Sequence, residues 1–189
     1  MKNLLADLSS SRAARIVGIS FVIMFLLGIL GAFVVQTSQL GIISYSVILA
    51  CDVVVALGLY ALLKLVNNNL ALLAMVLRLV YVALTLVFLF AIPYSYGQLV
   101  AYTFFILHLF VFGYLVFKSG YIPRSLGVLL VIASFCFLIA NYGRFLLPRE
   151  WYDPLFMIVF VPATISEISL GIWLLLRGAR IPEARKAKE

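Results

Sequence analysis

The chain has 189 residues, of which 66% are hydrophobic and 11% are charged, and its mean hydropathy is +1.20. Soluble domains contain about 45–50% apolar and about 25% charged residues, and a fold of this size leaves much of its surface facing its solvent. The composition therefore excludes a soluble enzyme, a nucleic-acid-binding domain and a disordered regulator, and it predicts a protein surrounded by lipid.

Six apolar segments are long enough to cross a membrane, because an α-helical span needs about 20 apolar residues. In chain order they cover residues 16–35, 42–63, 70–92, 99–117, 126–147 and 155–176. The linkers between them are short and contain helix breakers, as in residues 93–97 and 148–154. We expect an all-α, polytopic transmembrane helix bundle with six spans, in which residues 1–189 form a single domain and residues 177–189 a basic cytoplasmic tail.

The positions of Lys and Arg predict the orientation, since these residues are enriched in cytoplasmic loops. Eleven of the fourteen lie on the side that holds both termini: Lys2, Arg12, Arg15, Lys64, Lys118, Arg124, Arg177, Arg180, Arg185, Lys186 and Lys188. Both termini are therefore expected in the cytoplasm (N-in/C-in). We attribute the net charge of +7 to a tail that attracts anionic headgroups of the surrounding membrane lipids. No nucleic-acid partner is needed to explain it, and the sequence does not predict an oligomeric state.

Four polar side chains fall at one depth inside the spans. Asp52, Arg78, His108 and Glu167 lie on four different segments, each about 9 to 11 residues from the expected cytoplasmic end. At about 1.5 Å per residue they form a layer a few ångströms thick. A charge at the bilayer centre costs about 2.5–3.5 kcal/mol on insertion scales, so such residues tend to be paired or functional. We call these four residues the polar layer and predict that they bind a small ligand or a proton.

The charges of the polar layer leave three interpretations open. Two acids face one arginine, so neutrality requires either a protonated His108 or one protonated carboxyl, and such a layer could bind and release one proton. A structural ion network that only fixes helix packing is the first alternative. An integral-membrane enzyme acting on a lipid is the second, with His108 or Glu167 as general base. The sequence assigns no catalytic residue.

Secondary candidates lie on the same helical faces or nearer the opposite membrane surface. Tyr81 and Thr85 share a face with the arginine of the polar layer, and Thr164 shares one with the glutamate. Asn141 and Arg144 lie nearer the outer surface, where they would line a vestibule or cap the span. The sequence has no metal-binding or nucleotide-binding motif, so we expect neither a metal nor a cofactor.

An aromatic residue followed four positions later by a base recurs at the end of every second span. The three pairs are Tyr60 with Lys64, Tyr114 with Lys118, and Trp173 with Arg177. These residue types serve as anchors at a membrane interface. Alternatively, the pattern indicates three repeated helix hairpins.

Three stretches resemble one family: YALLKLVNNNLALLA (60–74), GYLVFKSGYIPRSLGVLL (113–130) and EISLGIWLL (167–175). The chain resembles the membrane-protein family catalogued as domain of unknown function 4386, although Leu65 stands where the family pattern has proline. The resemblance implies a multi-pass protein of a bacterial inner membrane with no assigned reaction. It also implies that Asp52, Arg78, His108 and Glu167 match family positions of the same chemical type.

The orientation is testable with fused reporters. We expect a reporter placed after Lys188 to report the cytoplasm and one inserted at Tyr96 to report the exterior, because the charge bias and the even number of spans agree. Export of the C-terminal fusion would contradict the assignment of all six spans.

Overall fold

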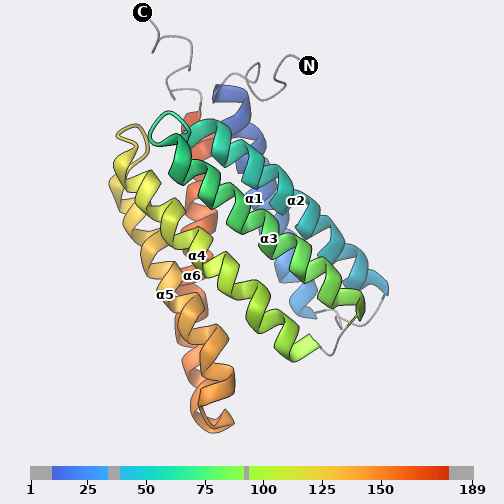
Figure 1. Cartoon of the computed structure of the whole chain (residues 1–189). Coiled ribbons are helices and arrows are strands. Elements are labelled where there is room, and N and C mark those ends of the chain that lie inside the picture. Colours follow the sequence, from blue (N-terminus) through green and yellow to red (C-terminus); the bar gives the residue numbers. More distant parts are fainter. Residues whose placement is uncertain (1–9, 34–38, 92–93, 179–189) are drawn as a thin grey trace, which may run out of the picture.

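The computed structural model describes residues 10–33, 39–91 and 94–178, and this part of the chain forms six α-helices (Figure 1). They are α1 (Ser10–Phe33), α2 (Gln39–Leu63), α3 (Asn68–Ala91), α4 (Tyr94–Lys118), α5 (Arg124–Leu146) and α6 (Arg149–Arg177). Each is long and apolar enough to cross a membrane, which confirms the predicted all-α bundle. The helices have 23 to 29 residues, or roughly 35–44 Å at about 1.5 Å per residue. A helix satisfies its own backbone hydrogen bonds, as lipid requires.

The prediction was wrong about two of the linkers. Residues 93–97 and 148–154 were expected between spans, but α4 begins at Tyr94 and α6 begins at Arg149. At the second site the cause is clear, because Pro148 is the N-cap residue of α6. Proline breaks a helix interior but is well tolerated where a helix starts, where its missing N–H would have no helical partner. Pro148 therefore marks the start of a helix rather than a long loop.

The helices form a closed arrangement in which each packs against its neighbours in the chain and α6 packs against α1. As a result, the start of α1 and the end of α6 lie at the same end of the bundle (Figure 1). The contact between α1 and α6 is close, since a Cβ atom added to Gly18 would lie 2.8 Å from the carbonyl oxygen of Gly171. Glycine at both positions lets the two backbones approach, as in other membrane helix pairs.

A second glycine contact joins α4 to α5. A Cβ atom added to Gly127 would lie 2.5 Å from the backbone nitrogen of Phe117 and 2.8 Å from the carbonyl oxygen of Gly113. Both of these neighbours are backbone atoms, which cannot move aside as a flexible side chain can. The α4–α5 distance is therefore set by the absence of a side chain at residue 127.

The first half of α6, which follows the end of α5, contributes few side chains to the bundle interior. Trp151 is 71% exposed, Met157 is 70% exposed and Ile158 is 69% exposed, and lipid is the environment that such a surface requires. In the view of Figure 1, α5 and α6 extend farther at this end than α4 does. This half of α6 contains both Pro154 and Pro162.

We expect Gly127→Ala to lower the thermal stability of the protein in detergent. The added methyl group would force α4 and α5 apart, and overpacking of this kind typically costs about 1–3 kcal/mol. Gly28→Ala on α1 is the matched control, because a Cβ atom at residue 28 would meet nothing within 4 Å. Equal melting temperatures for the two variants would contradict the proposed backbone contact.

Candidate functional site

Arg78 on α3 is fully buried, with 0% of its surface exposed, and it forms an ion pair with Asp52 on α2. Its Nε donates a hydrogen bond of 2.8 Å and its Nη2 one of 2.5 Å, both to Oδ1 of Asp52. Asp52 is itself only 1% exposed. Two charges that would be costly in lipid therefore compensate each other, which is the arrangement in which such groups are tolerated inside a membrane.

His108 on α4 contacts the same turn of α3 with both ring nitrogens. Its Nε2 lies 3.1 Å from Nη1 of Arg78, and its Nδ1 lies 2.7 Å from the carbonyl oxygen of Ala74. A guanidinium group can only donate, so Nε2 accepts the first hydrogen bond, and Nδ1 must donate the second. These contacts assign His108 as the neutral imidazole with its proton on Nδ1. Ala74 lies four residues before Arg78, and its small side chain lets the ring reach the backbone.

Aromatic rings pack against both Arg78 and His108. The guanidinium carbon of Arg78 lies 5.6 Å from the ring centroid of Phe21 on α1 and 5.5 Å from that of Phe105 on α4. Both distances are within the range of a cation–π interaction. The imidazole of His108 stacks on Phe112, with 5.5 Å between ring centroids. Arg78 thus contacts α1, α2 and α4 from its position on α3.

Glu167 on α6 is the member of the polar layer that the hydrogen-bonded network does not include. Its Oε1 atom is buried and has no hydrogen-bond partner among the described residues, although Arg78 and Asp52 both act on it electrostatically. One turn further along α6, Gly171 packs against Phe21, whose Cβ would lie 2.6 Å from a Cβ atom at residue 171. Since Phe21 also covers Arg78, α1 connects the glutamate's face of α6 to the network.

The secondary candidates occupy different environments. Tyr81 is buried, with its ring centroid 4.8 Å from that of Phe105, and Oγ1 of Thr85 is a buried atom for which the described residues provide no hydrogen-bond partner. Thr164 is half-buried on α6. At the other end of the bundle, Nδ2 of Asn141 donates a 3.2 Å hydrogen bond to the carbonyl oxygen of Leu99, tying α5 to α4. Arg144 is exposed.

Sequence reasoning missed three components of this site. Phe21, Phe105 and the carbonyl group of Ala74 complete the surroundings of Arg78 and His108, and none of them belongs to a residue type that signals a polar site. Helical spacing places Ala74 on the face of Arg78 and Phe105 on the face of His108, but it assigns neither of them a role in the site. Phe21 lies on a helix without any polar-layer residue, and only its depth along α1 could have suggested a role.

A small cavity of about 10 Å³ lies between α2, α3 and α4 beside His108, and Ala56, Ala71 and Phe112 are among its lining residues. A buried water needs about 10–15 Å³ of such space together with two to four polar partners. The cavity therefore has room for no more than about one water, and most of its lining is apolar.

The donor set of the polar layer does not fit a metal ion. Both nitrogens of His108 are used by Arg78 and Ala74, and the neighbouring guanidinium already supplies the positive charge that Asp52 requires. In the parts of α1 to α6 that the structure describes, no three His, Cys, Asp or Glu side chains gather where they could hold one.

Comparison with known proteins identifies relatives without an assigned activity. The family model described as "Domain of unknown function (DUF4386)" matches residues 36–93 and 84–178, which include all four polar-layer residues. An "Uncharacterized protein" of Archaeoglobus fulgidus is 35% identical over 147 residues, covering 75% of this chain and 86% of that protein. No solved structure matches the chain. The extent of both matches shows that this chain belongs to the DUF4386 family.

Proposed function

We propose that this protein is a proton-responsive multi-pass membrane protein of a bacterial inner membrane, in which the polar layer carries one exchangeable proton. The observation that carries this proposal is the buried, unpartnered Oε1 of Glu167 beside an ion pair that is already complete. A transport or sensing role would use the gain and loss of this proton to change how the helices pack.

The charges of the polar layer support Glu167 as the proton carrier. His108 is neutral in the observed hydrogen-bonding arrangement, so it does not offset a second acid. Asp52 neutralises Arg78 through two hydrogen bonds. An ionised Glu167 would therefore be an uncompensated negative charge in a low-dielectric interior, which a buried group avoids by taking up a proton.

The two helices that pack against α6, namely α1 and α5, place no further described charged side chain at the depth of Glu167. Arg78 and Asp52 are the charged groups that act on Glu167. The described titratable and charged residues of α1 and α5, most of them near the helix ends, are Arg12, Arg15, Arg124, Cys136, Tyr142 and Arg144. If Glu167 lost its proton, the new negative charge would act mainly on Arg78. The Arg78 side chain would then be attracted away from α2 and α4 and toward α6.

A structural role for the network is the second candidate, and the complete burial of Arg78 favours it. Arg78 contacts side chains from three other helices, so it could serve only to fix their packing. The lipid-enzyme alternative is less well supported for His108, because Nε2 would have to leave Arg78 before acting as a base. Glu167 remains the better candidate base.

A pH series on the wild type and Glu167→Gln tests the proton proposal. A carboxyl that holds its proton in the folded state and releases it on unfolding destabilises the protein as the pH rises, by up to about 1.4 kcal/mol per pH unit. We therefore expect the melting temperature of the wild type to fall between about pH 5 and 8 and that of Glu167→Gln to change much less. The infrared band of a protonated carboxylic acid should also disappear in this variant.

Two controls accompany this experiment. Glu150→Gln alters an exposed carboxyl in the first turn of the same helix and should leave the pH profile unchanged. The triple variant Asp52→Asn, Arg78→Met, Glu167→Gln removes the charges together with their desolvation cost, and it should fold with a flat profile. A wild-type profile as flat as that of the triple variant would refute the proton proposal and leave the structural role.

The burial of Arg78 has its own test. Arg78→Leu leaves Asp52 unpaired in the interior, and breaking a buried ion pair in this way costs about 3–5 kcal/mol. We expect a large loss of folded protein and of thermal stability in detergent. Arg149→Leu is the control, because that side chain is 92% exposed and its nitrogen lies 3.6 Å from Asp153, a surface pair worth at most about 0.5 kcal/mol. Equal stabilities of the two variants would contradict a buried network.

A further inference from the structure

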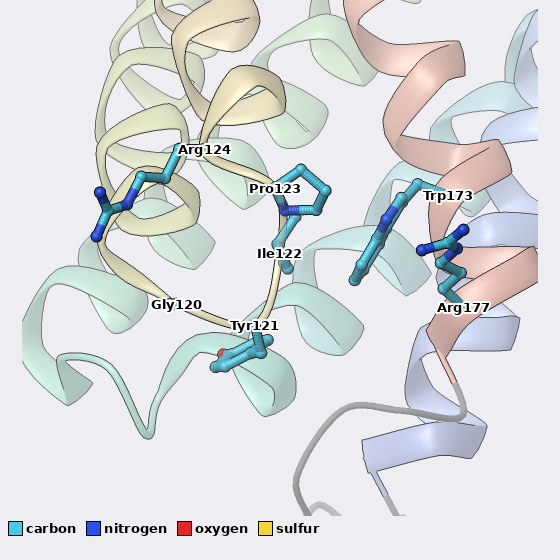
Figure 2. A pocket seen from close by; sticks show the side chains of 7 residues that line it. All are labelled: Gly120, Tyr121, Ile122, Pro123, Arg124, Trp173 and Arg177. Carbon is cyan, nitrogen blue, oxygen red and sulfur yellow. The ribbon is translucent and has the colours of Figure 1, made fainter.

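A cavity of about 480 Å³ lies at the end of the bundle where α1 starts and α6 ends, between the α4–α5 loop and the last turns of α6. Its lining includes Tyr121, Pro123, Arg124, Trp173 and Arg177. Figure 2 shows Pro123 and Ile122 facing the Trp173 ring across it, with Arg177 beside that ring and Arg124 directed away along the start of α5. This volume lies within the roughly 300–1,000 Å³ typical of small-molecule sites.

The loop that forms one wall is held in place by the rest of the bundle. The Tyr121 hydroxyl donates a 2.6 Å hydrogen bond to the carbonyl oxygen of Leu62 on α2, and the backbone N–H of Ile122 donates one of 3.2 Å to Oγ of Ser119. Ile122 is only 3% exposed. Burial raises the pKa of Tyr121 to about 12, so its hydroxyl stays a donor at physiological pH. The wall is therefore preformed.

The chemistry of the cavity favours an anion that also has an apolar part. Arg177 and Arg124 provide two positive charges. The N-cap residue and the first residue of α5 line the cavity, so the positive end of the α5 helix dipole lies at its wall. Trp173 provides an amphipathic ring of the kind found at headgroup depth. Next to Arg177, Leu176 is 77% exposed, and such an apolar surface suits contact with an acyl chain.

We infer that this cavity binds the phosphate group of an anionic glycerophospholipid from the leaflet on the side where α1 starts and α6 ends. Arg177 and Trp173 hold the headgroup on the α6 side, and Arg124 completes the site by rotating its exposed side chain from the α5 side. This site is distinct from the polar layer, and it differs from a diffuse attraction between lipid and the basic tail because it depends on two particular arginines.

The binding test uses the full-length protein in neutral detergent, with Trp151→Phe so that Trp173 is the remaining tryptophan of the two in the chain. Phosphatidylglycerol should change the Trp173 fluorescence and raise the melting temperature, whereas phosphatidylcholine with the same acyl chains should do neither. Adding Arg124→Gln and Arg177→Gln together should weaken the apparent affinity about thirtyfold, with Arg177→Gln causing the larger single loss. Circular dichroism of each variant shows whether it remains folded.

A tail variant separates the cavity from general electrostatic attraction. Arg180→Gln, Arg185→Gln, Lys186→Gln and Lys188→Gln remove twice as many charges as the cavity variant, and together they should weaken binding less than the cavity pair does. An equal or larger loss in the tail variant would overturn the inference, as would an unchanged affinity in the folded cavity variant. Equal stabilisation by soluble glycerol phosphate at the same concentration would exclude a lipid as the occupant.

Discussion

A guanidinium group at the centre of an apolar bundle is the constraint on which the rest of this structure depends. The positive charge of Arg78 is removed from solvent in this interior, and the fold supplies a carboxylate, an acceptor nitrogen and two aromatic faces in its place. These groups come from α1, α2 and α4, and all must arrive at one depth. The positions of four helices are therefore fixed by one side chain on α3.

The glycine contacts complement this central constraint. Arg78 joins α1 to α4, while Gly113 and Gly127 bring α5 against α4, and Gly18 and Gly171 bring α6 against α1. Helices in lipid gain little from the hydrophobic effect when they associate, because lipid chains are as apolar as their side chains. Close backbone approach and a central polar network provide the contacts that replace it. The carboxyl of Glu167 lies on α6, and no hydrogen bond among the described residues joins its Oε1 atom to this network.

Sequence alone predicted the six spans and the shared depth of the polar layer, because both follow from one-dimensional quantities: the length of an apolar run and the number of residues from its end. It also anticipated that Arg78 would have an acidic partner, which the structure identifies as Asp52. The protonation of His108 was left open, since it depends on which atoms its two nitrogens meet. The contribution of Phe21 could not be predicted, because it depends on how α1 is rotated about its axis.

The prolines of α6 have a mechanical consequence for this arrangement. Pro162 has no N–H to donate, so the carbonyl group of Ile158 lacks its usual helical partner, and a helix bends most easily at such a point. On one side of it, Gly171 packs closely against α1. On the other side, α6 packs against α5 and leaves Trp151, Met157 and Ile158 exposed. A change in bilayer thickness is absorbed by helix tilting and kinking. In α6 this bending would occur at Pro162, five residues from Glu167. A change in bilayer thickness would therefore alter the surroundings of the buried carboxyl.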